Sequence, residues 1–286
     1  MVSFGCGSIV GPVSEFCGME KTHVEQFWRS IGHLQLAVEH WHELDSTNDR
    51  ARALCHEISH PVLVTAAHQR AGRGRHGNVW YDVPGAALLM SVGIPTPLPT
   101  HKPAPTVVVL ATAACAVLTE LVRLVRPDCV RLKYPNDVWV KPSNAPAGKV
   151  GGMLIETDYV GAEPGVCVVG IGINLQGAPM LGDAAYPARC LADVAVAPLP
   201  LPEELAERIA ERLLSDLLHN QPQTLMQRWQ EELRLLGHRV VLRSDAVPAV
   251  VVAYGDDGSL RARRCDTDAA ITLRDADSLL YDPFAA

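Results

Sequence analysis

The pattern of hydrophobic and polar positions changes its period several times along the chain, and these changes predict an order of strands and helices. Two-residue alternation and short apolar runs indicate strands, whereas apolar positions three and four residues apart indicate helices. Strands are expected at 36–44, 62–67, 86–94, 130–134, 138–141, 150–156 and 166–174. Helices are expected at about 23–31, 48–58, 106–125, 202–218 and 222–236. The pattern thus predicts strands and helices interspersed along one chain.

Residues at the predicted helix ends suggest where elements begin and stop. Ser46 precedes the expected helix at 48–58, and Asp49 lies three residues after Ser46. This spacing is a variant of the capping box. Gly237 ends the helix at 222–236 in the usual way. From residue 238 the pattern changes to short strands, at 239–242, 247–253, 260–263 and 270–273. We therefore expect an N-terminal extension at 1–33, a main domain at 34–236 and a small β module at 237–286.

Composition excludes several classes of protein. The chain has 286 residues, of which 48% are hydrophobic and 20% charged, as in an ordinary globular protein with a sizeable core. A net charge of −7 argues against a general binder of nucleic acids or anionic membranes. The eight cysteines show no paired spacing, which favours free thiols in a reducing compartment. No apolar stretch is long enough to span a bilayer and no signal peptide is visible, so a cytoplasmic location is expected.

The charge is unevenly distributed. Between residues 58 and 119 the chain carries four basic residues and a single acid, Asp82. A basic window in an acidic chain is where an anion would bind. A solvated loop without a ligand is the alternative explanation of the charge pattern alone.

A glycine- and arginine-rich loop, Gly72–Gly77, lies in this window. It matches G-x-G-x-x-G, but the following residues cannot form a helix and no acid lies between Asp82 and Glu120, which excludes a Rossmann fingerprint. A Walker motif is also excluded, because the loop has no Gly-Lys-Ser/Thr. Glycines expose backbone N–H groups and arginines supply fork-shaped donors. The loop is therefore suited to a phosphate or a carboxylate, and could become ordered on its anion.

Three further segments combine glycines or turn residues with polar side chains. They are Lys133-Tyr134-Pro135-Asn136-Asp137, Gly148 to Glu156, and Gly170-Ile171-Gly172-Ile173-Asn174. The first alone reads as a turn, and the glycines of the others could serve packing. Strand interiors disfavour glycine, however, unless something must approach closely. Together with the loop, these segments suggest one ligand lying across a sheet.

In this order and spacing, the motifs resemble those of the biotin–protein ligases. The resemblance rests on Asp45-Ser46-Thr47-Asn48, Gln69 with the loop 71–77 and Trp80, the 133–137 segment, Lys149 with Gly152, Leu154 and Glu156, and Gly170 to Asn174. It covers about residues 40–176, and the module after 236 looks like the family's C-terminal domain. The implied fold is α+β: a mixed-sheet catalytic domain flanked by helices, of the class II synthetase-like or biotin–lipoate ligase type, with a small SH3-like β-barrel.

The resemblance also implies roles for individual residues. Ser46, Thr47 and Gln69 would bind the ureido and ring atoms of biotin, while Arg73, Gly74 and Arg75 would close over biotin and the adenylate phosphate. Lys149 would hold the biotin carboxylate and the α-phosphate. Asn136 and Asp137 would bind ATP and Mg²⁺, and Asn174 would bind the nucleotide. Trp80 would line the side of the site that faces biotin. Three of these, Lys149, Arg75 and Asp137, are the candidate catalytic residues, and the remaining candidate binding residues are Asn48, Gly72, Gly152 and Gly172.

The implied reaction consumes ATP in two steps. Biotin and ATP give biotinyl-5′-AMP, and a lysine of a biotin carboxyl carrier domain then takes the biotin. Bringing a carboxylate to a polyphosphate requires cations, because two like charges about 4 Å apart repel by roughly 4 kcal/mol at an effective dielectric near 20. A lipoate or octanoate ligase or transferase, and a non-enzymatic biotin-binding protein, stay open as alternatives.

The sequence also departs from the family pattern. His76 and Asn78 stand where many members have a second pair of arginines, and Tyr134 replaces a tryptophan. Some bacterial members carry an N-terminal helix-turn-helix. The 33 residues before the first expected strand are too few and too neutral for one, so no DNA binding is expected.

Overall fold

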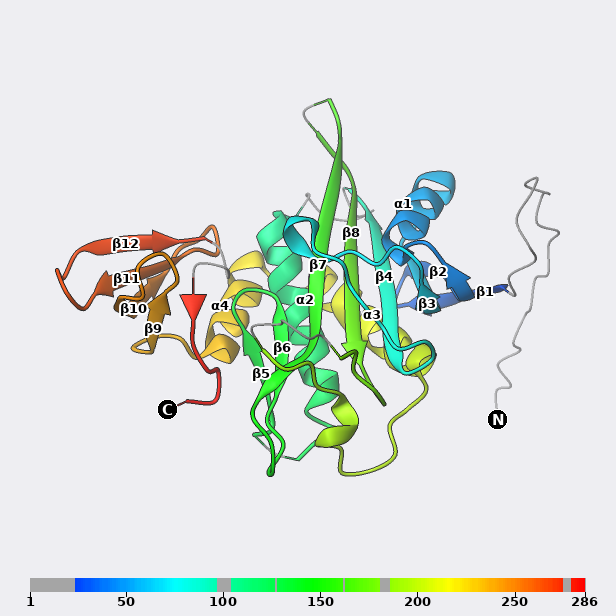
Figure 1. Cartoon of the computed structure of the whole chain (residues 1–286). Coiled ribbons are helices and arrows are strands. Elements are labelled where there is room, and N and C mark those ends of the chain that lie inside the picture. Colours follow the sequence, from blue (N-terminus) through cyan, green and yellow to red (C-terminus); the bar gives the residue numbers. More distant parts are fainter. Residues whose placement is uncertain are drawn as a thin grey trace, which may run out of the picture.

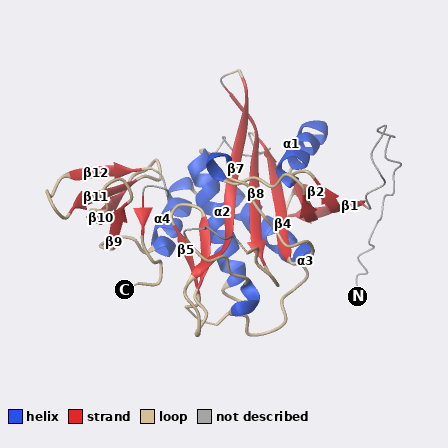
Figure 2. Cartoon of the chain, in the orientation of Figure 1, coloured by secondary structure: helices blue, strands red, loops and turns tan. Residues whose placement is uncertain are grey.

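The structure, a computed structural model, describes residues 24–96, 104–126, 128–161, 163–180, 186–274 and 279–285. These residues form an eight-stranded mixed sheet, four α-helices and a second sheet of five strands (Figures 1 and 2). The main sheet consists of β1 (Val24–Ile31), β2 (Leu34–Leu44), β3 (Val62–Gln69), β4 (Ala87–Pro95), β5 (Val130–Lys133), β6 (Asp137–Val140), β7 (Gly148–Val160) and β8 (Glu163–Asn174). The helices are α1 (Thr47–Ile58), α2 (Thr106–Leu121), α3 (Pro202–His219) and α4 (Pro222–Leu233). The second sheet consists of β9 (Arg239–Leu242), β10 (Pro248–Tyr254), β11 (Leu260–Arg264), β12 (Ala270–Leu273) and β13 (Leu279–Leu280).

The strand order of the main sheet is β1-β2-β3-β4-β8-β7-β6-β5. The β2–β3 pair is parallel, because α1 crosses over between these two strands, and the other neighbours are antiparallel. This arrangement is the mixed sheet with flanking helices that the family resemblance implies. It also brings the segments that the sequence singled out on β7 and β8 side by side at the centre of the sheet.

Helices cover both faces of this sheet, and alternation along the strands explains why. On β3, Val62 and Val64 belong to a small apolar cluster that includes Leu54 and Cys55 of α1. Leu63, between them, faces the opposite side and joins the large cluster that contains α2, α3 and α4. Because successive side chains of a strand point to opposite faces, one buried strand serves both layers. Figure 2 shows α2 behind the central strands.

The second sheet is entirely antiparallel, in the order β12-β11-β10-β9-β13, and it curls as in SH3-like folds. It shares its hydrophobic core with the main sheet. Trp229 on α4 is almost fully buried in the same cluster as Val251 and Leu260 of the second sheet. The Tyr134 hydroxyl also donates a hydrogen bond to the Gly258 carbonyl oxygen, at 3.0 Å. The small sheet is therefore packed firmly against the rest of the chain.

Most of the expected elements are found, and three local predictions are wrong. The expected helix at 23–31 is strand β1, which pairs along its whole length with β2. The main sheet therefore starts at residue 24, and not at the first expected strand, 36–44. The side chain of Ser46 makes no capping hydrogen bond, so the capping box with Asp49 is absent. Helix α4 ends at Leu233, where Arg234 adopts a left-handed conformation, rather than at Gly237.

Other differences concern lengths. Strand β7 extends to Val160 and helix α2 stops at Leu121, four residues before its expected end. The short strand β13 was not expected. The expected N-terminal extension up to residue 23 and the segment 97–103 lie outside the described residues.

Candidate active site

A pocket lies on the α1 side of the main sheet, beside the N-terminal end of that helix, and has a volume of about 180 Å³. Its walls come from the start of α1, the end of β3, the glycine- and arginine-rich loop, the turn between β5 and β6, and strands β7 and β8. The predicted site residues that line it are Ser46, Thr47, Asn48, Gln69, Arg73, Gly74, Arg75, Trp80, Asn136, Asp137, Lys149, Gly152 and Gly172. Segments far apart in the sequence thus meet around one cavity.

The strand glycines make room for side chains of the protein itself. A Cβ atom at Gly172 would lie 2.6 Å from two ring carbons of Trp80, and a Cβ atom at Gly170 would overlap the amide of Asn48. Real Cβ atoms do not approach other atoms so closely. The glycines of β8 therefore allow the Trp80 indole and the Asn48 amide to lie directly against the sheet, where both line the pocket.

A cluster of hydroxyls and amides forms one part of the wall. The backbone N–H and the hydroxyl of Thr47 both donate to Gln69 Oε1, at 2.8 and 3.0 Å. The hydroxyl of Ser91 lies 2.7 Å from Thr47 Oγ1 and 2.6 Å from Asn48 Oδ1. Ser46, which precedes the helix, is buried and also lines the pocket. These bonds fix several donors and acceptors in a small area, as recognition of a polar ring requires.

Lys149, on β7, brings a cation to the pocket. Its Nζ lies 2.7 Å from Asp137 Oδ1 and 5.9 Å from the centre of the Trp80 ring. Gly152 is the cross-strand partner of Asp137. A Cβ atom at Gly152 would lie 3.3 Å from Lys149 Nζ, so the glycine keeps space open beside the amine.

Arg75 reaches the turn between β5 and β6. Its guanidinium donates to Asn136 Oδ1, at 3.0 Å. Asn136 is itself buried, and its amide nitrogen donates to the Met153 carbonyl oxygen, at 2.7 Å. The loop that carries Arg75 is thereby joined to the turn that carries Asn136 and Asp137.

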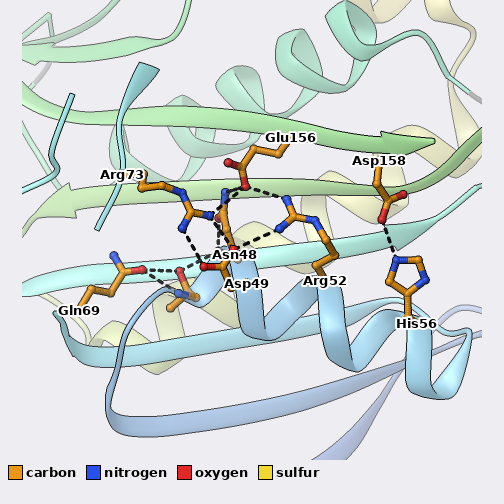
Figure 3. Close-up of polar contacts among 10 residues, drawn as sticks. Asn48, Asp49, Arg52, His56, Gln69, Arg73, Glu156 and Asp158 are labelled. Carbon is orange, nitrogen blue, oxygen red and sulfur yellow. Dashed lines mark hydrogen bonds and ion pairs between the residues drawn. The ribbon is translucent and has the colours of Figure 1, made fainter. Parts of the chain in front are cut away.

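Arg73 points to a different group of residues (Figure 3). Its guanidinium donates two hydrogen bonds to the carboxylate of Asp49, both at 2.7 Å, and lies 3.4 Å from Glu156 Oε2. The hydrogen bond from Arg73 lowers the pKa of Asp49 below its usual value. The same bond, with the charge of Glu156, raises the pKa of Arg73. This group is charged and paired at neutral pH.

The charge of the lining favours an anionic ligand. Among the described residues that line the pocket, Arg73, Arg75 and Lys149 are cationic and Asp137 is the one carboxylate. The charge of Arg73 is balanced by Asp49 and Glu156, so Arg75 and Lys149 are the lining cations that remain for a ligand. A cleft lined mainly by one sign of charge attracts ligands of the opposite sign. The basic window seen in the sequence therefore contributes directly to this cavity.

Two predicted residues do not line the pocket. Gly72 accepts a hydrogen bond from the Trp80 N–H, at 3.0 Å, and a Cβ atom there would lie 2.7 Å from the Trp80 carbonyl oxygen. Asn174, at the end of β8, is buried and donates to the Arg189 carbonyl oxygen, at 3.1 Å. In the structure, Gly72 shapes the base of the loop and Asn174 fastens the segment around Arg189.

Sequence reasoning did not select several residues of this region. Ser91 and Met90, on β4, looked like part of an apolar strand. Asp49 and Glu156 were not chosen as site residues, although Glu156 belongs to a motif and Asp49 directly follows Asn48. Their contacts with Arg73 join positions 24 and 83 residues apart in the chain. A pattern within a single segment cannot reveal such a contact.

Lys133, the first residue of the 133–137 motif, lies in an aromatic cage beside the pocket. Its Nζ lies 3.8 Å from the ring centre of Tyr186, 4.1 Å from that of Trp139 and 5.4 Å from that of Tyr281. Burial lowers the pKa of Lys133 to about 8. The rings attract an ammonium and so oppose this shift.

Within the described parts of the chain, no three His, Cys, Asp or Glu side chains gather in a group that could hold a metal ion. The six described cysteines are free. No described helix is long and apolar enough to cross a membrane.

Comparison with known proteins shows what the central part of this chain is similar to. The model of the biotin/lipoate A/B protein ligase family matches residues 42–174. The biotin–[acetyl-CoA-carboxylase] ligase of Mycobacterium tuberculosis is 36% identical over 168 residues, which cover 55% of this chain and 58% of that protein. The enzyme of the same name from Paracoccus denitrificans is 37% identical over 144 residues, covering 48% and 54%. Residues 42–174 of this chain are therefore similar to the biotin/lipoate A/B protein ligase family.

Solved structures show the same fold. The biotin protein ligase of Aquifex aeolicus, in complex with biotin and ATP, superposes with a TM-score of 0.60 at 20% identity, covering 83% of this chain and 99% of that one. The biotin protein ligase of Leishmania major, in complex with biotinyl-5-AMP, gives 0.52 at 26% identity, covering 82% and 96%. The chain spans somewhat more than half the length of the curated relatives from Mycobacterium and Paracoccus.

Proposed function

We propose that this chain is an ATP-dependent biotin–protein ligase. In the first step a carboxylate oxygen of biotin attacks the α-phosphorus of ATP, the bond to the β-phosphate oxygen breaks, and biotinyl-5′-AMP and pyrophosphate result. In the second step the amine of a lysine on a biotin carboxyl carrier domain attacks the carbonyl carbon of this mixed anhydride. AMP leaves, the amine loses a proton, and an amide forms.

The observation that carries the proposal is the placement of Lys149. Its amine lies in one pocket with the Trp80 ring and with the bonded cluster of Thr47 and Gln69. Biotin has a polar ureido ring, an apolar chain and a carboxylate, which correspond to these three kinds of wall. The match of residues 42–174 to the biotin/lipoate A/B protein ligase family supports the same ligands, as do the similar structures in complex with biotin and ATP or with biotinyl-5-AMP.

The predicted residues that line the pocket, apart from Arg73, receive roles in this proposal. Ser46, Thr47, Asn48 and Gln69 bind the ureido ring, and Trp80 lies along the apolar part above the space that Gly172 provides. Lys149 and Arg75 offset the charges of the biotin carboxylate and the α-phosphate, as pre-positioned cations do in other transfer reactions. Asn136 and Asp137 bind the nucleotide side. Gly152 leaves room for the reacting groups, and Gly74 keeps the loop backbone close to them.

A magnesium ion fits this pocket as a companion of ATP. Mg²⁺ is commonly bound by one or two carboxylates together with substrate phosphates and water, and Asp137 is a lining carboxylate of the pocket. Asp137 would hold the ion, which would offset phosphate charge when bound. The protein's own residues position the substrates: Lys149 beside the attacking carboxylate, and Arg75 across the pocket.

The partner in the second step is a biotin carboxyl carrier domain of a biotin-dependent carboxylase. Its target lysine must reach the adenylate through the pocket opening. We place the reaction in the cytoplasm, where ATP is available and where thiols such as the six free cysteines stay reduced.

The test mixes the purified protein with biotin, Mg²⁺ and ATP and measures pyrophosphate release, followed by mass spectrometry of an added carrier domain. We expect pyrophosphate on mixing and one biotinyl group on the carrier. Labelling by lipoate or octanoate in place of biotin would assign the lipoate branch of the family instead. Biotin binding without any pyrophosphate release would leave only a binding protein.

A further inference from the structure

Arg73 lies in the loop that the motif assigns to the ligand, yet its side chain is held by two carboxylates of the protein (Figure 3). Asp49 accepts two hydrogen bonds from it, both at 2.7 Å, and Glu156 Oε2 lies 3.4 Å away. A two-point contact between an arginine and a carboxylate fixes the orientation of both groups. An anionic ligand that drew Arg73 into the pocket would have to break these bonds.

The two carboxylates come from the elements that form the walls of the pocket. Asp49 lies in the first turn of α1, directly after Thr47 and Asn48, and Glu156 lies on β7, the strand that carries Lys149. The Asn48 amide nitrogen also donates to Glu156 Oε2, at 2.9 Å. Loop, helix and strand thus meet at one small group of charges.

Arg52, one turn further along α1, completes this group. Its guanidinium lies 2.8 Å from Glu156 and 3.2 Å from Asp49. Two arginines and two carboxylates therefore alternate, and the charge of Arg73 is balanced within the group. Single exposed ion pairs contribute little to stability, but connected pairs with two-point geometry are the exception.

The loop itself is also ordered by its backbone. The N–H of Gly74 donates to the Asn78 carbonyl oxygen, at 2.7 Å, and the N–H of Trp80 donates to the Gly72 carbonyl oxygen, at 3.0 Å. The loop therefore behaves as a small closed unit, and fixing Arg73 fixes the position of Trp80 and Arg75 as well. Arg75 leaves the unit on the other side, towards Asn136.

We propose that Asp49, assisted by Glu156, is a positioning residue that holds the loop against α1 and β7 through Arg73 before any ligand binds. The two arginines of the loop then have different tasks: Arg73 fastens the loop, and Arg75 faces the reacting groups. This proposal rests on the proposed function for the identity of the ligand, but its claim about the loop does not need the ligand.

The first experiment compares the wild-type chain with Asp49→Asn, which keeps the size of the side chain and removes its charge. Trypsin cleavage of the ligand-free protein reports on the loop, which contains Arg70, Arg73 and Arg75. We expect cleavage in the loop to be roughly tenfold faster in the variant, because the two-point contact is lost. The KM and Kd for biotin should rise by about tenfold and kcat should change much less, since Lys149 and Arg75 stay in place. Asp49→Glu, which keeps the charge, should cleave at close to the wild-type rate and should have a KM and a Kd for biotin close to the wild-type values.

His56→Ala is the matched control. The ring of His56 lies 2.7 Å from Asp158 Oδ2, so it joins the same helix to the same strand without touching the loop (Figure 3). This variant should leave loop cleavage and the KM for biotin unchanged. Equal effects of His56→Ala and Asp49→Asn would mean that general helix packing is responsible, and would overturn the proposal.

A double variant tests whether Asp49 acts through Arg73. In an Arg73→Gln background, Asp49→Asn should have no further effect on loop cleavage or on the KM for biotin, because its partner is already gone. If Asp49→Asn raised loop cleavage or the KM for biotin by the same factor in the Arg73→Gln background as in the wild-type protein, Asp49 would act independently of Arg73. If neither single variant changed loop cleavage, the loop would need no such contact. Either result overturns the proposal. If the wild-type protein binds no biotin, the proposed function fails, and the cleavage pattern still decides the role of Asp49.

Discussion

Lys149 Nζ and Asp137 Oδ1 lie 2.7 Å apart, although the strand register places Gly152, and not Lys149, opposite Asp137. The pairing of β6 with β7 shifts by one residue between Val138 and Trp139, which places Lys149 opposite Trp139. The lysine side chain then extends along the sheet to Asp137, over the space that Gly152 leaves. Ligand-free, the amine has a carboxylate partner that an incoming phosphate or carboxylate can replace.

Lys149→Met should abolish adenylate formation and leave the fold intact. Removing one pre-positioned charge from a reaction centre typically slows the reaction by about 10²- to 10³-fold, so pyrophosphate release should fall by at least this amount. Asp137 is partly solvated, with 22% of its side chain exposed, so it can be hydrated when its partner is gone.

Lys141→Met is the control for this prediction, because Lys141 is exposed and lies outside the pocket. It should keep normal turnover. Near-normal pyrophosphate release by Lys149→Met would show that the carboxylate and the α-phosphate bind elsewhere.

Gly172→Ala should weaken biotin binding and destabilise the protein. The new Cβ atom would lie 2.6 Å from the Trp80 ring, so either the indole or strand β8 must move. Overpacking of this kind costs about 1–3 kcal/mol. Urea unfolding should show this loss, and calorimetry should show a Kd for biotin about tenfold higher, because Trp80 lines the pocket.

Gly177→Ala serves as the comparison, since its nearest atom, the Cβ of Ala86, would be 3.6 Å away. It should behave like the wild-type protein. If Gly172→Ala bound biotin normally, the position of the Trp80 ring would be irrelevant to the ligand.

The same glycines show how far the sequence alone could lead. The alternation of Gly170 and Gly172 within an apolar strand predicts a close approach to β8, and the structure shows that approach. The approaching groups are Asn48 and Trp80, from other parts of the chain, rather than a ligand. Periodicity shows that space is needed, but it does not show which atoms fill it, because these come from distant positions.

Strand β1 shows the opposite case, in which a local pattern misleads. The segment Val24–Ile31 contains apolar residues at spacings that suit a short helix as well as a strand. Pairing with β2 decides between them, since all eight residues find partners there. Tertiary pairing of this kind is not encoded in the segment itself. The contacts of Arg73 with Asp49 and Glu156 were beyond prediction for the same reason.

Tyr281→Phe should weaken the packing of the second sheet against the 133–137 segment and lower the free energy of unfolding. The Tyr281 hydroxyl accepts a hydrogen bond from the Tyr134 N–H, at 2.7 Å, in a buried setting. Without it, a buried backbone donor has lost its partner, which costs about 1–3 kcal/mol. Urea unfolding should measure this loss, and the KM for ATP should rise more than the KM for biotin, because Asn136 and Asp137 follow Tyr134 closely.

Tyr159→Phe changes the same group at a site where the residue is 62% exposed, and it should leave unfolding unchanged. Equal stability of Tyr281→Phe and Tyr159→Phe would mean that the hydrogen bond between the second sheet and the 133–137 turn contributes nothing.

Lys133 makes the stability of the protein depend on pH in the alkaline range. Burial lowers the pKa of Lys133 to about 8 in the folded protein, whereas a lysine in an unfolded chain titrates near about 10.4. Between these values the unfolded chain binds more protons than the folded one, so the contribution of Lys133 to the free energy of unfolding rises with pH. Lys133→Met lacks this contribution. The wild-type free energy of unfolding, minus that of Lys133→Met, should therefore increase by about 2 kcal/mol between about pH 7.5 and pH 10.

Urea unfolding at constant ionic strength across this range measures the difference, and Lys141→Met, which removes an exposed ammonium, should show no such trend. Parallel pH profiles of the wild-type protein and Lys133→Met would contradict the prediction. They would mean that the rings of Tyr186 and Trp139, at 3.8 and 4.1 Å, stabilise the ammonium enough to cancel the effect of burial.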